Sequence, residues 1–143
     1  MRRAKRTIAS VLIVIATLSV CCLSTTAAAR ASEYIDQTYT EMFAGYDKGE
    51  LDIDFSISAI KNPTLLGIYK IAFYKSDGTF VTNVWGTVIN GLLSNSGSRS
   101  YEGTYTFDRA EPGVSYYAVV TFMAKDSKGG DKFEMETSVV KAP

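Results

Sequence analysis

The stretch Leu51–Ser58, LDIDFSIS, alternates without exception between apolar residues and aspartate or serine. Successive side chains of a β-strand point to opposite faces, so the four apolar residues would share one face and the polar residues the other. The alternation therefore predicts a β-strand that packs one face on a core and exposes the other to water.

The same period of two continues along the chain, and turn residues separate the apolar segments. Further strands are expected at residues 65–74, 79–89, 99–108, 114–125 and 133–140, with loops rich in glycine, asparagine, aspartate and serine between them. In the first of these segments Tyr69, Ile71 and Phe73 should share one face. The segment Val114–Lys125, VSYYAVVTFMAK, is apolar on both faces, which predicts a central place in its sheet.

Residues 32–46 admit two interpretations. Their apolar residues have the spacing of a helix, and Ser32 could cap it. The turn sequence Asp47-Lys48-Gly49 instead suits a hairpin that follows a strand at Tyr39–Ala44, and we favour the strand. With that strand included, the sequence predicts an all-β fold, a single sandwich of about seven antiparallel strands.

The first 31 residues have the three parts of a secretory signal peptide. A basic start, MRRAKR, is followed by the apolar run Ile8–Leu23 and by the small-residue segment STTAAARA, which ends at Ala31. We expect a signal-peptide helix within residues 1–31, cleavage between Ala31 and Ser32, and a secreted domain at residues 32–143.

Alternatives to this route remain open. Cleavage could follow Ala29, where a second small-residue site ends. The leader could remain as an uncleaved membrane anchor, although its apolar run is short for a span. Cys21 or Cys22 could carry a lipid, and Arg2-Arg3 could direct the chain to the twin-arginine route.

Charge and composition exclude several classes of function for residues 32–143. This part of the chain keeps 10 of the 15 basic residues and all 15 acidic ones, so its net charge is −5. Because negative charge repels phosphate backbones and anionic lipid, we expect no nucleic-acid partner, and membrane contact only through the signal peptide before cleavage. The chain has no histidine, and both cysteines lie in the leader. These facts exclude Ser–His and Cys–His catalytic pairs, imidazole metal ligands and disulfides from the domain.

Carboxylates are the remaining candidates for chemistry. Asp52 and Asp54 point the same way from one strand, but nothing in the sequence places them in a cleft, as a glycosidase pair requires. Asp77, Asp126 and Asp131 lie in loop sequences, where aspartate commonly forms turns, and they lack the dense spacing of a calcium loop. We therefore expect no catalytic residue, no metal and no cofactor, and a small hydrolase is a remote alternative.

The turn Pro112-Gly113-Val114-Ser115-Tyr116 resembles the turn into strand F of a fibronectin type III or immunoglobulin-like sandwich, where a tyrosine hydroxyl bonds back to upstream backbone as a tyrosine corner. The resemblance implies that role for Tyr116 and a strand order A, B, C, C′, E, F, G. Residues 69–73 resemble strand C and residues 51–55 resemble strand B, although Phe55 stands where a core tryptophan is common.

The C-terminal half is also similar to a family of short secreted proteins from Gram-positive bacteria whose function is unknown. The similar segments are Tyr116–Phe122, Asp126–Asp131 and Thr137–Val140, together with Gly67–Gly78 earlier in the chain. This resemblance implies secretion and a sandwich fold, and it implies no activity and no functional residue.

The outward face of the segment Val114–Lys125 is a candidate contact surface. Its outward-pointing residues are expected to be Tyr117, Val119, Thr121, Met123 and Lys125, with Tyr74 of the neighbouring strand beside them. An aligned apolar row with tyrosine and methionine is typical of a contact surface. The alternative is that residues 32–46 cover this row.

Trp85 has two interpretations, a core residue or an exposed platform that could stack on a sugar ring with help from Asn83. Two binding functions follow from these surfaces. The first is an extracellular protein-interaction or adhesion module that uses Tyr74, Tyr117, Val119 and Met123. The second is a small carbohydrate-binding module centred on Trp85. The expected partner is accordingly an extracellular protein or a polysaccharide.

Overall fold

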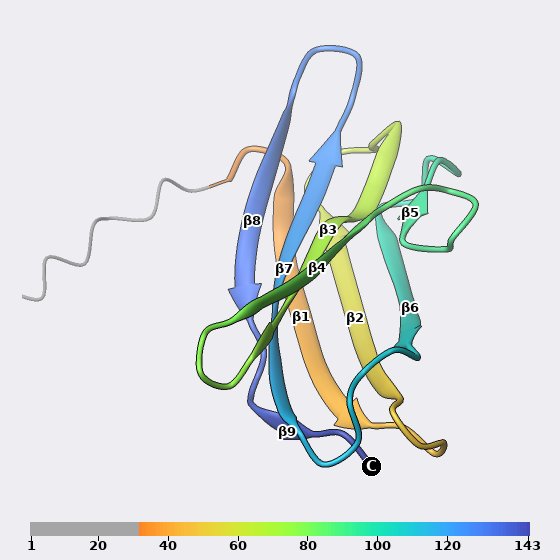
Figure 1. The fold of residues 1–143 in the computed structure, drawn as a ribbon. Helices are drawn as coiled ribbons and strands as arrows, with labels where there is room; N and C mark the ends of the chain where they lie inside the picture. Colours follow the sequence, from red (N-terminus) through yellow and green to blue (C-terminus); the bar gives the residue numbers. More distant parts are fainter. Residues whose placement is uncertain (1–31) are drawn as a thin grey trace, which may run out of the picture. The chain divides into compact units, whose positions relative to one another are not determined.

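The structure is a computed structural model that describes residues 32–143 (Figure 1). The expected signal-peptide helix and Ala31 lie outside the described residues. Within residues 32–143 every regular element is a β-strand. The same residues contain no helix that is long and apolar enough to cross a membrane.

Two antiparallel sheets face each other as the layers of a β-sandwich (Figure 1). The three-stranded sheet has the order β1-β2-β6, made of β1 (Ile35–Ala44), β2 (Leu51–Ala59) and β6 (Ser100–Phe107). The six-stranded sheet has the order β4-β3-β7-β8, made of β4 (Phe80–Trp85), β3 (Leu65–Lys75), β7 (Ser115–Lys125) and β8 (Gly130–Glu136). Two short strands complete it, β5 (Leu93–Ser94) beside β3 and β9 (Val140–Lys141) beside β7.

The all-β sandwich predicted from the sequence is confirmed, and so is the strand interpretation of the N-terminal segment, which forms β1. The central position predicted for β7 is also confirmed, because β3 pairs with one side of it and β8 with the other. The prediction of a strand as far as Ile89 was wrong, because β4 ends at Trp85.

The core lies between the two sheets and is built mainly from the inward half of the alternating pattern, with Leu92, Ala110 and Ala142 added from outside the strands. Every second residue of β2 from Leu51 to Ala59 is buried, while the residues between them are partly exposed. Opposite them, Ala118, Val120 and Phe122 of β7 are fully buried. Each fully buried large apolar side chain contributes about 1.5–3 kcal/mol to the free energy of unfolding. This burial holds the domain together without any disulfide.

Tyr116 ties the start of β7 to the loop before it. Its side chain is almost fully buried, and its hydroxyl accepts a hydrogen bond of 2.8 Å from the backbone N–H of Glu111. This bond from upstream backbone is the one expected of Tyr116 at a tyrosine corner. The carboxylate of Glu111 lies 2.9 Å from the ammonium of Lys75, and that hydrogen bond raises the pKa of Lys75.

Replacing Tyr116 by phenylalanine removes this hydrogen bond and keeps the ring in the core. We expect Tyr116→Phe to lower the free energy of unfolding by about 1 kcal/mol or somewhat more, the scale of one buried hydrogen bond. Chemical denaturation of the two proteins measures the difference, and coincident midpoints would show that the corner does not stabilise the fold.

Candidate functional site

The outer face of the six-stranded sheet carries a row of aromatic rings across three neighbouring strands. Tyr74 of β3 and Tyr117 of β7 are register partners, and their rings stack with centroids 5.2 Å apart and planes 11° apart. Phe80 of β4 lies opposite Tyr74 and contacts it edge to face at 5.6 Å. Both tyrosines are half-buried and Phe80 is 53% exposed. The structure thus brings together the two tyrosines predicted for this surface and adds Phe80 to them.

A second aromatic group lies further along the same face. Tyr69 and Trp85 meet edge to face with centroids 5.4 Å apart and planes 82° apart. The ammonium of Lys132 lies over the Tyr69 ring, 3.4 Å from its centroid, and that of Lys70 lies 5.9 Å from the Trp85 ring. We call the five rings Tyr69, Tyr74, Phe80, Trp85 and Tyr117 the aromatic face.

A β-bulge puts Tyr69 on this face. The pairing of β3 with β7 steps from Ile68 directly to Lys70, so Tyr69 is an extra residue with no partner opposite. A bulge changes the direction in which the following side chains point. Tyr69 therefore contacts outward residues, and the prediction that it shares one face with Ile71 and Phe73 was wrong.

Trp85 is an exposed residue and not a core residue, with 53% of its surface accessible. It is the last residue of β4, and Gly86 follows it. The backbone N–H of Gly86 donates to the carbonyl of Tyr69, and a Cβ at this glycine would lie only 1.8 Å from the carbonyl oxygen of Ile68. Only glycine fits so close to that backbone, and the chain then leaves the sheet with Trp85 at its edge.

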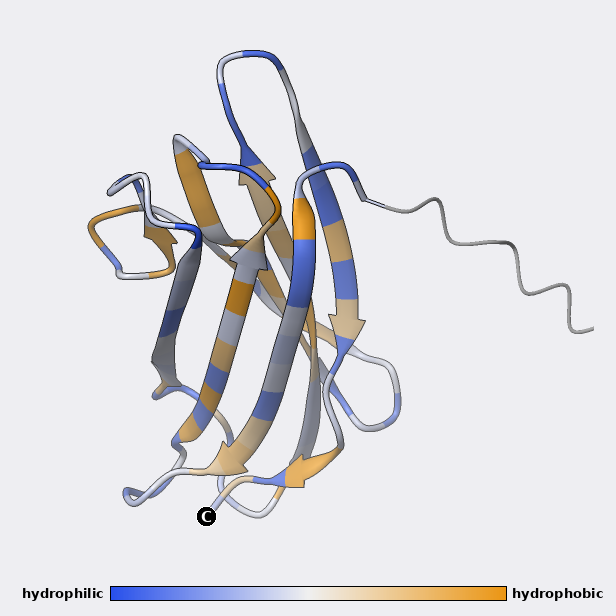
Figure 2. Cartoon of the chain, turned by 180° about the vertical axis from the view of Figure 1, so that it is seen from behind, coloured by the Kyte–Doolittle hydropathy of each residue, from blue (hydrophilic) through white to orange (hydrophobic). Residues whose placement is uncertain are grey.

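The loop from Gly86 to Leu92 presents two aliphatic side chains to water. Ile89 is 98% exposed and Val88 is 47% exposed. Figure 2 shows the hydrophobic colour of this loop between β4 and β5. The pattern of the sequence predicted these two residues inside a strand, where alternate residues would be buried.

The side chain of Asn90 holds this loop in one shape. Its oxygen accepts hydrogen bonds from the backbone N–H groups of Thr87, at 2.9 Å, and Leu92, at 3.2 Å. Its amide donates to the carbonyl of Trp85 at 2.8 Å, and its own backbone N–H donates to the Thr87 hydroxyl. The exposed aliphatic pair is therefore held by a hydrogen-bonded turn.

The same part of the chain carries no charge. The 20 residues from Thr79 to Ser98 include no aspartate, glutamate, lysine or arginine, although 21% of the whole chain is charged. We call its four exposed large apolar residues, Phe80, Trp85, Val88 and Ile89, the neutral edge. Sequence reasoning did not single out Phe80, Val88 or Ile89, and the absence of charge was the signal that could have found them.

The other two predicted surface residues are less accessible. Val119 lies between the two aromatic groups opposite Ala72 and is half-buried. Met123 faces outward but is only 8% exposed. Its register partners are Gly67 on β3 and Lys132 on β8, and the contact between Lys132 and Tyr69 must cross the outer side of β7. The expectation of an accessible Met123 was therefore wrong.

The alternative that residues 32–46 cover this face was also wrong. They form β1, which pairs with β2 in the other sheet. Among the described residues, the outer side of β7 is covered by side chains of its own sheet.

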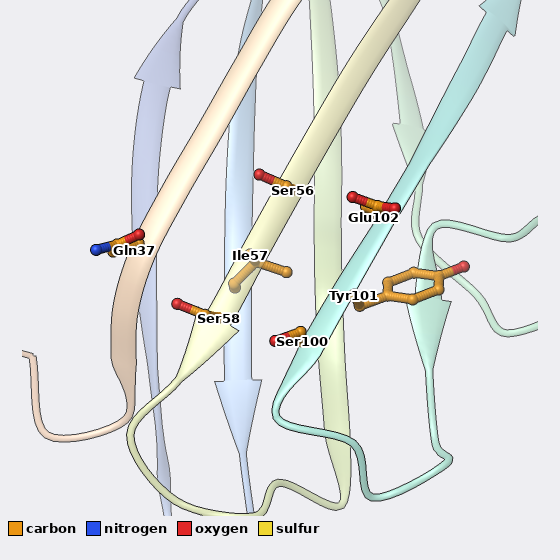
Figure 3. A pocket seen from close by; sticks show the side chains of 7 residues that line it. All are labelled: Gln37, Ser56, Ile57, Ser58, Ser100, Tyr101 and Glu102. Atoms are coloured by element: carbon orange, nitrogen blue, oxygen red, sulfur yellow. The ribbon is translucent and has the colours of Figure 1, made fainter.

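The outer face of the three-stranded sheet is mainly polar, although Tyr39 and Phe43 are exposed on it, and it holds a shallow pocket of about 530 Å³. Three serines line it together with Gln37, Glu102 and Ile57, and Tyr101 points away from it in Figure 3. Asp54 and Asp52 accept hydrogen bonds from the hydroxyls of Thr104 and Thr106 on β6. These two carboxylates thus form cross-strand hydrogen bonds on an open face, away from the aromatic face.

Two of the three aspartates expected in loops form turns, whereas Asp131 lies in β8. Asp77 accepts a hydrogen bond from the backbone N–H of Thr79, and hydrogen bonds from Thr79 lower the pKa of its carboxyl. Asp126 accepts from the N–H groups of Lys128 and Gly129. No group of three or more potential metal-ligating side chains occurs within residues 32–143.

The burial of Met123 makes the face testable. Met123→Lys places a second ammonium directly opposite Lys132 and buries part of it. We expect a loss of about 1–3 kcal/mol in the free energy of unfolding. Met123→Leu, which keeps the volume, is the control and should stay near wild type. Equal thermal midpoints for all three proteins would mean that the site is open to water.

In a comparison with known proteins, no protein-family model and no curated protein matches the chain.

Proposed function

We propose that this protein is a secreted, non-catalytic binding module that contacts an extracellular protein through the neutral edge and the adjoining aromatic face. The observation that carries the proposal is the coincidence of exposure with absence of charge. All four residues of the neutral edge are between 47% and 98% exposed, and all lie in the 20-residue segment without a charged side chain.

The physical chemistry of protein interfaces supports this assignment. The centres of such interfaces are poor in charged residues and rich in aromatic ones, because burying a charge carries a large desolvation cost. The hydrogen bonds of Asn90 keep Val88 and Ile89 in place before any partner arrives. A rigid loop loses little conformational entropy on binding, so more of the contact energy remains as affinity.

A polysaccharide is the second candidate, and the exposure of Trp85 favours it. A sugar ring stacks on an open aromatic face. Tyr74 and Tyr117 stack on each other and Lys132 lies over Tyr69, so these three rings each have one face in contact. Phe80 and Trp85 pair with β3 residues four positions apart, which separates them by about 13 Å. The fully exposed aliphatic Ile89 suits an apolar pocket on a protein better than a sugar.

The topology supports a relationship to fibronectin type III-like sandwiches. With the strands lettered as expected from the sequence, β1-β2-β6 corresponds to A-B-E and β4-β3-β7-β8 to C′-C-F-G. The hydrogen bond of Tyr116 agrees with that assignment. The relationship to the short secreted proteins of Gram-positive bacteria rests on the sequence segments alone. Neither of these two relationships is evidence for a binding function, because a shared fold does not imply a shared function. The proposed binding function is argued only from the exposed residues of the neutral edge and the aromatic face.

Secretion is part of the proposal and rests on the leader sequence. The first strand begins at Ile35, so cleavage between Ala31 and Ser32 would remove no residue of the sandwich. We expect the exported protein to begin at Ser32, and mass spectrometry of the secreted form measures this. Recovery of the intact leader in the membrane fraction would support an anchored protein instead.

A photoreactive phenylalanine analogue at position 89 tests the neutral edge directly. Incubated with the secreting cells and their medium, it should give a discrete, protease-sensitive crosslinked product. Trp85→Ala in the same protein should lower the yield at least several-fold, because it removes a large neighbouring contact. The matched control carries the analogue at Phe43, which is 41% exposed on the outer face of the other sheet.

The two candidate partners give different results. If the partner is a protein, Trp85→Ala and Ile89→Ser should both weaken binding. If the partner is a polysaccharide, sedimentation with insoluble glycans should detect binding that Trp85→Ala abolishes and Ile89→Ser preserves. Equal crosslinking from positions 43 and 89 would contradict a role for the neutral edge.

A further inference from the structure

The carboxylate of Asp131 accepts hydrogen bonds from three successive residues that precede the first strand. One oxygen, Oδ2, accepts hydrogen bonds from the Ser32 hydroxyl at 2.7 Å, the Glu33 N–H at 2.8 Å and the Tyr34 N–H at 3.2 Å. Asp131 belongs to β8 of the six-stranded sheet, while the residues it holds lead into β1 of the three-stranded sheet. This cluster therefore joins the two sheets at one end of the sandwich.

Ser32 is held from its other side as well. Its hydroxyl oxygen accepts hydrogen bonds from the N–H groups of Ile35, at 2.7 Å, and Tyr34, at 3.2 Å. Within one serine the backbone nitrogen and the hydroxyl oxygen are only three bonds apart. The Ser32 nitrogen must therefore lie within about 6 Å of the Asp131 carboxylate.

Cleavage of the leader changes the chemistry of that nitrogen. In the uncleaved chain it is part of a neutral amide. Hydrolysis of the bond between Ala31 and Ser32 gives the hydroxyl of water to the Ala31 carbonyl and a proton to the Ser32 nitrogen, which becomes a primary amine. An α-amine has a pKa of about 7.7–8.0 and is largely protonated at neutral pH, and a carboxylate within about 4–6 Å favours the protonated form.

Several carboxylates lie near this cluster among the described residues. The pKa of the Tyr34 phenol is raised by its burial and then by the nearby carboxylates of Asp126, Glu33 and Asp131. One cation lies near the same ring, the ammonium of Lys61 at 5.6 Å from its centroid. A new ammonium at Ser32 would therefore have carboxylates within reach, the nearest of them that of Asp131.

We propose that Asp131 is the binding site for the chain's own α-ammonium group, which exists only after cleavage between Ala31 and Ser32. Removal of the leader then does more than release the protein. It creates a charge that strengthens the junction between β1 and β8, so the processed domain is more stable than the same domain with a blocked N-terminus. This inference rests on the proposed secretion, and it does not depend on what the neutral edge binds.

The test compares the secreted protein with the same protein acetylated at its α-amine. Acetylation at pH 6.5 selects this amine because lysine side chains are protonated up to a much higher pH. We expect acetylation to lower the thermal midpoint of the wild-type protein. The same modification should leave the midpoint of Asp131→Asn unchanged, because the carboxylate charge that the ammonium would meet is absent.

Asp126→Asn is the matched control, since it removes a carboxylate of the same hairpin that accepts hydrogen bonds from Lys128 and Gly129, and it should keep most of the acetylation effect. An unchanged midpoint on acetylating the wild type overturns the proposal, as does an equal loss in Asp131→Asn. If Asp131→Asn does not fold, the wild type and the Asp126→Asn control decide the question. A secreted form that does not begin at Ser32 overturns both this site and the proposed cleavage, whereas failure of the crosslinking experiment affects only the binding function.

Discussion

The fold depends on the burial of one sheet against the other, and the stacked rings of Phe73 and Phe107 join the two sheets directly. Phe73 belongs to the six-stranded sheet and Phe107 to the three-stranded sheet, and their centroids are 4.2 Å apart. Because residues 32–143 contain no cysteine, no disulfide assists this contact. Apolar burial between the sheets is therefore the main term that opposes the conformational entropy of the chain.

The inward half of each strand could be predicted because it follows from a single periodic pattern. The alternation in β2 and β7 directly identified which residues enter the core, and the structure buries them. The exposure of the outward residues depends on how neighbouring strands pair and cover one another, and the pattern within one strand does not show this. Tyr69 faces outward because of a bulge in the pairing with β7, and β4 stops where Gly86 meets the backbone of β3. Met123 is buried through side chains on two other strands.

Part of the candidate site could also be predicted from the sequence, and part of it could not. Tyr74 and Tyr117 could be placed together because both lie outward on strands expected to be neighbours. The exposed pair Val88 and Ile89 could not, because their apolar character indicates a strand, and only the hydrogen bonds of Asn90 reveal a turn. Local pattern therefore identifies the sheet that presents the site, and tertiary contacts decide which side chains reach the solvent.

The position of β4 at the end of its sheet has a further consequence for the behaviour of the concentrated protein. An end strand offers unpaired backbone groups to any other extended chain, and proteins usually block this with lysine, proline or a very short strand. β4 contains neither lysine nor proline, so its length of six residues and the irregular pairing near Phe80 are its main protection. β4 is therefore the edge at which the concentrated protein would associate strand by strand, and a ligand that covers β4 would oppose that association.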